Sequence, residues 1–456
     1  MRLSPRRRDG RRAMDAARPQ GPRTRWLRRG ARVALLLGFL ATSGAGGGAA
    51  DPAAAAERAE RARLESDVRL LAADQMEGRG LSSEGLDAAL RVVAARFQAL
   101  GLKAPYPERA SDEDPLAGYF QPFHAPGHPP SANVIGLLPG KQPSPPALLV
   151  IGAHVDHLGL APRDEAAADG DRIYNGADDN ASGVAALLEI ARLLAQAPVE
   201  PGDRDVALIA FSGEESGLLG SKHYVAHALR PPPETIAMLN LDSVGRLRND
   251  ELIVFGTQTA REFEATLAGL NHAYGFTLAL RGEGAGAADQ ASFFAADIPV
   301  LHFFTGPHED YSRVSDEADR IDYDGLQRVT DYVGELGRYL RYRPRPLTFV
   351  AAGREQAEKL DAMAQRGQRR VSLGFMPDFS REKGGVAVGP VFPGAAAATA
   401  GLQTGDVIVA INDEPVDTLI DYTALLRQHA PGDTIEVVIH RGPATQHLRI
   451  GVQERR

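Results

Sequence analysis

The stretch Ala147–His157 reads ALLVIGAHVDH, and it decides the fold. Its apolar first part predicts a buried strand over Ala147–Val155, and its polar end puts His154, Asp156 and His157 at the carboxyl end of that strand. Ligands of open α/β sheets bind at this edge. A histidine here can be a hydrogen-bonded structural residue. The functional interpretation is a metal-bound His154 whose other ring nitrogen is oriented by Asp156.

Strand patterns and helical patterns alternate around this stretch. Five further segments rich in Val, Ile, Leu and Phe are strand candidates: Asn133–Leu138, Val206–Phe211, Ile236–Leu241, Glu251–Phe255 and Pro299–Phe304. Helical periodicity occurs in Glu57–Ala99, broken at Gly78–Gly80, and in Ala181–Ala195, Leu218–Leu229, Glu262–His272 and Tyr323–Leu340. This alternation predicts an α/β sandwich with a largely parallel, buried sheet.

Two adjacent acids, Asp178 and Asp179, stand in Asn175–Gly183 at the head of a predicted helix. One interpretation is that they only cap the helix. The other is that this junction supplies a carboxylate held rigidly enough to bridge two cations. The regular helix that follows, about two dozen residues after His154, favours the second interpretation.

Two more strand ends carry acids. Glu214 and Glu215 follow the strand Val206–Phe211, and Asp242 follows the strand Ile236–Leu241. Adjacent acids at one strand end repel each other unless a cation relieves the repulsion. A set of histidine and carboxylates without cysteine suits Zn²⁺ in a two-metal hydrolase, with Mn²⁺ or Co²⁺ as alternatives. These junctions therefore predict a metal site.

The composition narrows the function classes. The 456 residues contain no cysteine, which excludes disulfides, thiolate catalysis and Cys-ligated zinc. The first 50 residues hold twelve arginines and two aspartates, so the rest of the chain carries 39 basic and 57 acidic residues. A body this acidic is a poor partner for nucleic acid and suits a protein that holds divalent cations.

The amino-terminal sequence predicts export. Arginines up to Arg32 precede a short apolar run, Val33–Leu40, and the small residues Gly48–Ala50. This order is typical of a signal peptide over residues 1–50, and the apolar run is too short for a stable transmembrane anchor. The interpretation places the mature protein in the bacterial periplasm or outside the cell.

The remaining chain divides into two predicted domains. Residues 57–342 contain the α/β pattern and the predicted metal site. Residues 343–369 begin with two prolines and continue as a charged stretch, which is typical of a linker. Residues 370–455 consist of short β-like runs separated by Gly and Pro, enough for one small β-rich domain.

Residues Glu65–Leu340 resemble the co-catalytic zinc aminopeptidase family that includes bacterial leucyl aminopeptidases and glutamate carboxypeptidase II. The resemblance rests on the motifs above in their order, on Met76–Gly80 (MEGRG) and on Phe303–Gly306 (FFTG). It implies a zinc-exopeptidase sandwich with two zinc ions. It also implies these roles: Asp178 bridges both ions, His154 and Asp242 bind one, Glu215 binds the other, Glu214 is the general base, and Asp156 orients His154.

Two positions depart from the family pattern. Ser312 stands where the family has its second-zinc histidine, and Gln290 stands where a histidine commonly follows Asp289. Neutral serine is a poor zinc ligand, so either His308 or water takes that place, or the second zinc is bound weakly. Tyr311 matches a neighbour that in some relatives can stabilise the tetrahedral oxyanion.

The tail resembles a PDZ domain of the bacterial protease-associated type. The loop Ser372–Phe375 (SLGF) looks like the carboxylate-binding loop, and two further motifs match at Pro393–Ala395 and Ala400–Ile408. The resemblance implies that backbone N–H groups around Leu373, Gly374 and Phe375 receive the C-terminal carboxylate of a peptide beside a strand edge. A purely structural β-domain is the alternative.

Together these features predict an exported metallo-aminopeptidase that removes N-terminal residues from peptides through a zinc-bound hydroxide. One alternative is a glutaminyl cyclase-like enzyme with one zinc, which the missing second-zinc histidine motivates. Another is a catalytically impaired scaffold in which the PDZ-like domain binds peptides.

Overall fold

The computed structural model describes residues 51–141, 147–161, 170–284, 286–351, 371–378, 384–392 and 394–454. The signal peptide predicted over residues 1–50 and most of the predicted linker lie outside these ranges. Among the described helices, none is long and apolar enough to cross a membrane.

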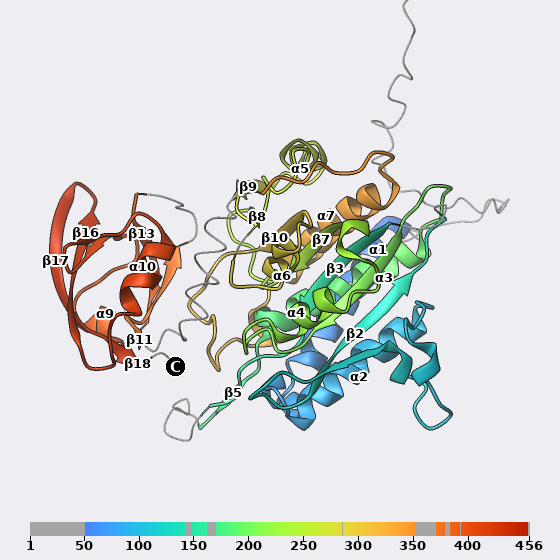
Figure 1. The fold of residues 1–456 in the computed structure, drawn as a ribbon, viewed down its shortest axis with the longest axis horizontal. Coiled ribbons are helices and arrows are strands. Elements are labelled where there is room, and N and C mark those ends of the chain that lie inside the picture. Colours follow the sequence, from blue (N-terminus) through green and yellow to red (C-terminus); the bar gives the residue numbers. More distant parts are fainter. Residues whose placement is uncertain are drawn as a thin grey trace, which may run out of the picture. The chain divides into compact units, whose positions relative to one another are not determined.

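An eight-stranded sheet forms the centre of the larger region (Figure 1), with the strand order β1-β2-β6-β3-β7-β10-β8-β9. Its four central strands, β6, β3, β7 and β10, are mutually parallel, whereas β2 and β8 pair antiparallel to the outer two of these. The strands are β1 (Phe120–Phe123), β2 (Ser131–Leu138), β3 (Leu148–His154), β6 (Asp205–Phe211), β7 (Thr235–Leu241), β8 (Glu251–Phe255), β9 (Thr277–Leu280) and β10 (Val300–Phe304).

Helices cover both faces of this sheet, because its central strands are apolar on both sides. In β3, Leu149 and Ile151 join one core, while Leu148 and Val150 join the core on the opposite face. The first core is covered by α1 (Pro52–Leu71), α2 (Glu84–Ala99), α3 (Gly183–Gln196), α5 (Phe263–Asn271) and α7 (Tyr323–Tyr342). The second is covered by α4 (Leu219–Ala226) and α6 (Gln290–Ala295). The predicted α/β sandwich is confirmed.

All six predicted strands and all the predicted helices are present, with ends shifted by a few residues. The elements that the sequence patterns missed are short: β1, β9, α6 and the two-residue pair β4 (Gly159–Leu160) and β5 (Ile173–Tyr174). Segments this short hold too few residues for a periodicity to emerge.

The C-terminal region is a separate antiparallel sheet with its own apolar core. Its main strand order is β12-β13-β14-β16-β17, so β12 lies at one edge of the described sheet. The strands are β11 (Val371–Ser372), β12 (Phe375–Asp378), β13 (Val386–Val391), β14 (Val407–Ile411), β15 (Glu414–Pro415), β16 (Thr434–Arg441), β17 (Ala444–Gly451) and β18 (Gln453–Glu454); the helices are α9 (Ala396–Thr399) and α10 (Leu419–Leu426). The predicted β-rich second region is confirmed.

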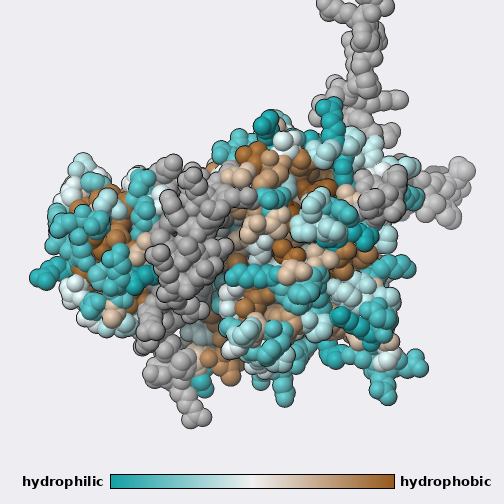
Figure 2. Space-filling model, in the orientation of Figure 1, coloured by the Kyte–Doolittle hydropathy of each residue, from teal (hydrophilic) through white to brown (hydrophobic). Residues whose placement is uncertain are grey.

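Hydrophilic residues cover much of the coloured surface in the view of Figure 2, with apolar patches between them. The large apolar side chains of the central strands lie inside, at or near zero exposure. This partition is the one expected when burial of apolar surface drives folding.

Candidate metal centre

Three neighbouring parallel strands end at one edge of the central sheet, and each is followed by polar side chains. β3 ends at His154, β6 leads into Glu214 and Glu215, and β7 leads into Asp242. A bent helical turn, Ala177–Ser182, precedes α3 and is hydrogen-bonded to the end of β7. The expected gathering of strand ends is therefore present.

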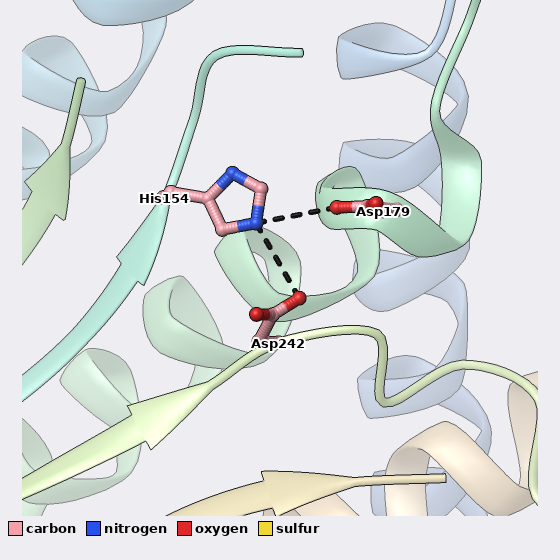
Figure 3. Close-up of side chains that lie close together, drawn as sticks. All are labelled: His154, Asp179 and Asp242. Atoms are coloured by element: carbon pink, nitrogen blue, oxygen red, sulfur yellow. Dashed lines mark hydrogen bonds and ion pairs between the residues drawn. The ribbon is translucent and has the colours of Figure 1, made fainter. Parts of the chain in front are cut away.

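His154, Asp179 and Asp242 form a first buried group (Figure 3). His154 Nε2 lies 3.2 Å from Asp179 Oδ1 and 3.4 Å from Asp242 Oδ1. The other ring nitrogen, Nδ1, lies 3.1 Å from the backbone carbonyl oxygen of Asp156. Because a carbonyl oxygen only accepts, Nδ1 carries a proton, so Nε2, which faces the two carboxylates, is the ring atom that could hold a cation.

The Asp156 carboxylate has a different task from the one predicted. It accepts hydrogen bonds from the backbone N–H groups of Glu214 (3.1 Å) and Glu215 (3.3 Å). His154 is hydrogen-bonded to the backbone carbonyl of Asp156, whereas the Asp156 carboxylate points toward the loop after β6. Asp156 thus fixes both glutamates relative to His154.

His157, Asp179 and Glu215 form a second group beside the first. His157 Nδ1 lies 2.8 Å from Glu215 Oε1 and 4.0 Å from Asp179 Oδ1. The imidazole of His157 is fully buried, and the Glu215 side chain is 24% exposed. Asp179 Oδ1 belongs to both groups, so a single carboxylate oxygen joins them.

Asp179 therefore occupies the bridging place that the sequence assigned to Asp178. The Asp178 carboxylate lies outside both groups and is engaged elsewhere. Its Oδ1 accepts the backbone N–H of Gly245 at 2.6 Å and the hydroxyl of Ser182 at 3.1 Å, and its Oδ2 lies 3.1 Å from His308 Nε2. The structure thus places the predicted bridge, Asp178, outside both groups, and Asp179 is the residue that they share.

The bend in the turn explains why the second acid points into the site. Asp179 has φ −108° and ψ 90°, which is not helical, so its side chain leaves the direction taken by Asp178. The carboxylate of Asp316, which is buried, holds the bend by accepting the backbone N–H groups of Asp178 at 2.9 Å and Asp179 at 3.1 Å.

Several carboxylates lie close together and buried at these strand ends. Burial raises the pKa of Glu214 well above its usual value and the pKa of Asp156 to about 6. Asp179 Oδ1 is buried and accepts no hydrogen bond of normal geometry. Because buried carboxylates are costly without a cation or a donor, the site is built to receive positive charge.

The spacing of the donor atoms fits zinc. Ligand atoms about 2.0–2.2 Å from a tetrahedral zinc lie roughly 3.3 Å from one another. The two distances in the first group, 3.2 and 3.4 Å, match this value, and those in the second group, 2.8 and 4.0 Å, lie on either side of it.

Comparison with known proteins identifies both regions. Residues 133–337 match the sequence profile of peptidase family M28. This segment, called the M28 region below, is therefore similar to the M28 peptidases. Residues 372–452 match the profile of the PDZ domain.

Three individual proteins illustrate what this chain is similar to. Aminopeptidase YwaD of Bacillus subtilis is 30% identical over 214 residues, which cover 44% of this chain and 43% of that protein. Leupeptin-inactivating enzyme 1 of Streptomyces exfoliatus is 30% identical over 190 residues, covering 41% of this chain and 38% of that protein. A solved structure of a zinc aminopeptidase from Bacillus subtilis is 18% identical and has a TM-score of 0.48; the match covers 61% of this chain and 94% of that chain. The chain spans less than half the length of these two curated relatives.

The remaining predicted residues of the M28 region take distinct positions. The Tyr311 ring contacts the His308 ring edge-on at 6.0 Å, and the charge of Asp179 together with burial raises the pKa of the Tyr311 phenol well above its usual value, so this hydroxyl remains a donor. Ser312 is exposed and belongs to neither group. His308 faces Asp178, and Gln290 Oε1 accepts a hydrogen bond from Asn240 at 3.1 Å.

The predicted carboxylate-binding loop of the PDZ region lies directly before its edge strand. Leu373 is fully buried in the core, and Phe375 packs edge-on against Tyr422 of α10 at 5.6 Å. Gly374 has φ +82°, and a Cβ there would lie 2.3 Å from the Cβ of Ala395, so only glycine fits. In this conformation the Gly374 N–H donates a hydrogen bond to the hydroxyl of Ser372 at 3.1 Å.

Two residues of the M28 region were not predicted as ligands, Asp179 and His157. For Asp179 the sequence signal is the acid pair Asp178-Asp179 at the head of the helix, from which the sequence alone favours Asp178. For His157 the signal was a second histidine three residues after His154 at the same strand end. Which side chains converge there depends on loops that are distant in sequence.

Proposed function

We propose that this chain is a zinc-dependent aminopeptidase that removes N-terminal residues from peptides. The observation that carries the proposal is the pair of His and carboxylate groups that share Asp179 at the strand ends of an M28 region. Aminopeptidase YwaD, whose matching segment is 30% identical, supports the same activity. Two zinc ions, held by His154, Asp179 and Asp242 and by Asp179 and Glu215, would supply Lewis acidity and a hydroxide at neutral pH.

Two side chains of the protein would carry out the proton transfer and stabilise the developing negative charge. Glu214 belongs to neither ligand group, and its backbone is fixed by Asp156, so its carboxylate is available to accept the proton of the attacking water and pass it to the leaving amine. The protonated phenol of Tyr311 would donate a hydrogen bond to the developing oxyanion.

The proposed activity predicts a requirement for a free amino terminus. The zinc-loaded full-length protein should hydrolyse amino acid p-nitroanilides and lose this activity at least 100-fold when the α-amine is acetylated. Removing the metal with a chelator should abolish hydrolysis, and added zinc should restore it. Equal hydrolysis of the acetylated compounds would contradict an aminopeptidase.

Two further measurements on the same protein distinguish the alternatives, which are a glutaminyl cyclase-like enzyme and a peptide-binding scaffold. Cyclisation of a peptide with N-terminal Gln, without hydrolysis, would show a glutaminyl cyclase-like enzyme. Less than about one zinc per chain after loading, together with no turnover, would favour the peptide-binding scaffold. The presence of His157 in the second group weakens the motive for the cyclase, which was the lack of a second-site nitrogen.

The PDZ region is proposed to bind the C-terminal carboxylate of a peptide. Its edge strand β12 can pair with an added strand, and the loop Leu373–Phe375 at the start of β12 carries the left-handed Gly374. A peptide laid along β12 would thus place its carboxylate near this loop. The match to the PDZ profile supports this mode of binding.

A pair of probes tests PDZ binding. In the full-length Glu214→Gln variant, which should not cleave the probe, a fluorescent peptide with an apolar C-terminal residue should bind at least 10-fold more tightly as the free acid than as the C-terminal amide. Equal affinities in a fluorescence anisotropy titration would refute carboxylate recognition and leave a structural role for this domain.

Export to the periplasm or the medium is part of the proposal. It is supported by the arginine-rich stretch, the apolar run and the small residues of the first 50 positions. Cell fractionation with amino-terminal sequencing would refute export if the full chain, still carrying residues 1–50, remained in the cytoplasm.

A further inference from the structure

The second group of the proposed zinc centre contains one nitrogen donor, and this donor is His157. The family resemblance places the second-zinc histidine at position 312, where this chain has an exposed serine. His308, the nearest alternative in sequence, directs Nε2 to Asp178 at 3.1 Å, and Asp178 lies outside both groups. The structure thus brings a histidine from a different element to the same pair of carboxylates.

The position of the His157 ring is set by the surrounding backbone. Its backbone N–H donates to the carbonyl of Arg79 at 3.1 Å, and its ring meets Tyr174 edge-on at 6.4 Å. Gly176 has φ +55°, and a Cβ there would lie 2.5 Å from Cδ2 of His157. The absence of a side chain at Gly176 therefore makes room for the imidazole.

Arg79 fixes the two chain segments that meet at this ring. Its guanidinium is 1% exposed and donates to the carbonyls of Val155 (2.8 Å), Asn175 (2.8 Å) and Gly176 (2.9 Å). These carbonyls lie just before His157 and just before the turn that carries Asp179. One buried side chain thus ties the strand end to the turn, and with it His157 to Asp179.

The donor atoms of His157 show where a cation would lie. Nδ1 points at the carboxylates of Glu215 and Asp179, whereas Nε2 is buried and has no hydrogen-bond partner. We propose that His157 Nδ1 is the nitrogen ligand of the second zinc ion and replaces the histidine that the family pattern places at position 312. This inference rests on the proposed zinc centre, and it changes which residues hold the second ion.

A simpler role for His157 is to donate one hydrogen bond to Glu215, and an asparagine variant distinguishes the two. In His157→Asn the side-chain amide lies near the position of Nδ1, so it can still donate to Glu215, but it is a poor zinc ligand. If His157 is a ligand, His157→Asn should weaken binding of the second zinc at least 10-fold. Even the loss of a residue that only orients a metal ligand typically lowers metal affinity about 10–100-fold. His157→Ala should do the same.

The measurements are made on the full-length protein, stripped of metal and reloaded with zinc. Competition with a chromophoric chelator gives the two affinities, and X-ray absorption counts imidazoles per zinc. The parent protein should bind two zinc ions with two imidazoles in all, and His157→Asn should keep one zinc with one imidazole at limiting zinc. His308→Ala should bind both ions as the parent does, and Ser312→His should restore the second ion in the His157→Asn background.

Three outcomes would overturn the inference. Unchanged second-site affinity in His157→Asn and His157→Ala would show that the histidine is not a ligand. Loss of the second ion in His308→Ala would give the role to His308. A parent protein that binds fewer than two zinc ions after loading would overturn this inference, and one that binds none would overturn the proposed zinc centre as well. Circular dichroism confirms that each variant is folded.

Discussion

Glu214→Gln is expected to lower kcat on an amino acid p-nitroanilide about 10³-fold and to leave both zinc sites filled. Glutamine keeps the size and the backbone hydrogen bond of Glu214 to Asp156 but cannot accept a proton. Loss of a general base costs typically 10²–10⁴-fold in rate. The effect should lie in kcat, because Glu214 belongs to neither ligand group and proton transfer occurs after the substrate is bound.

Glu215→Gln is the matched control, since it makes the same change one residue along the chain. Glu215 belongs to the second ligand group, so this variant should lose affinity for the second zinc. Zinc content measured beside kcat then separates the two glutamates. Full activity in Glu214→Gln, or loss of zinc from it, would contradict the role of Glu214 as the base.

Asp179→Asn is expected to weaken both zinc sites at least 100-fold, whereas Asp178→Asn should keep them. Asp179 Oδ1 is shared by both groups, so one substitution removes a charged ligand from each. The Asp178 carboxylate instead accepts the N–H of Gly245 and the hydroxyl of Ser182. Zinc titration of the two variants therefore tests which of these adjacent acids is the bridge.

The stability of the metal-free protein should fall more in Asp178→Asn than in Asp179→Asn, whereas zinc binding should fall more in Asp179→Asn. In Asp178→Asn the amide replaces a carboxylate that is fully buried and accepts two hydrogen bonds, so the free energy of unfolding of the metal-free protein should fall by about 1–3 kcal/mol. In Asp179→Asn the metal-free protein loses one of several crowded buried carboxylates together with its 3.2 Å pairing to His154, and these two effects oppose each other, so its stability should change less than in Asp178→Asn. Equal zinc loss in both variants would mean that Asp178 also binds metal.

Much of the fold could be predicted because its signals are local. The apolar run of β3, its neighbours β6 and β7, and the periodic helices α3 and α7 each carry their pattern within one segment. A pattern of apolar residues is set by which faces are buried, and both faces of these strands are covered. The short elements β1, β9 and α6 hold too few residues to show such a pattern, so the sequence does not predict them.

The sequence by itself determined which strand ends carry the chemistry, because His154, Glu214 with Glu215, and Asp242 all lie where strand patterns stop. Only the tertiary structure decided between Asp178 and Asp179, because the bend that turns them apart is held by Asp316, 138 residues away from Asp178. The same holds for His157, whose partners Asp179 and Glu215 come from two other loops. Local pattern encodes which residues reach the sheet edge, whereas the direction of each side chain there depends on hydrogen bonds between segments that only the folded chain brings together.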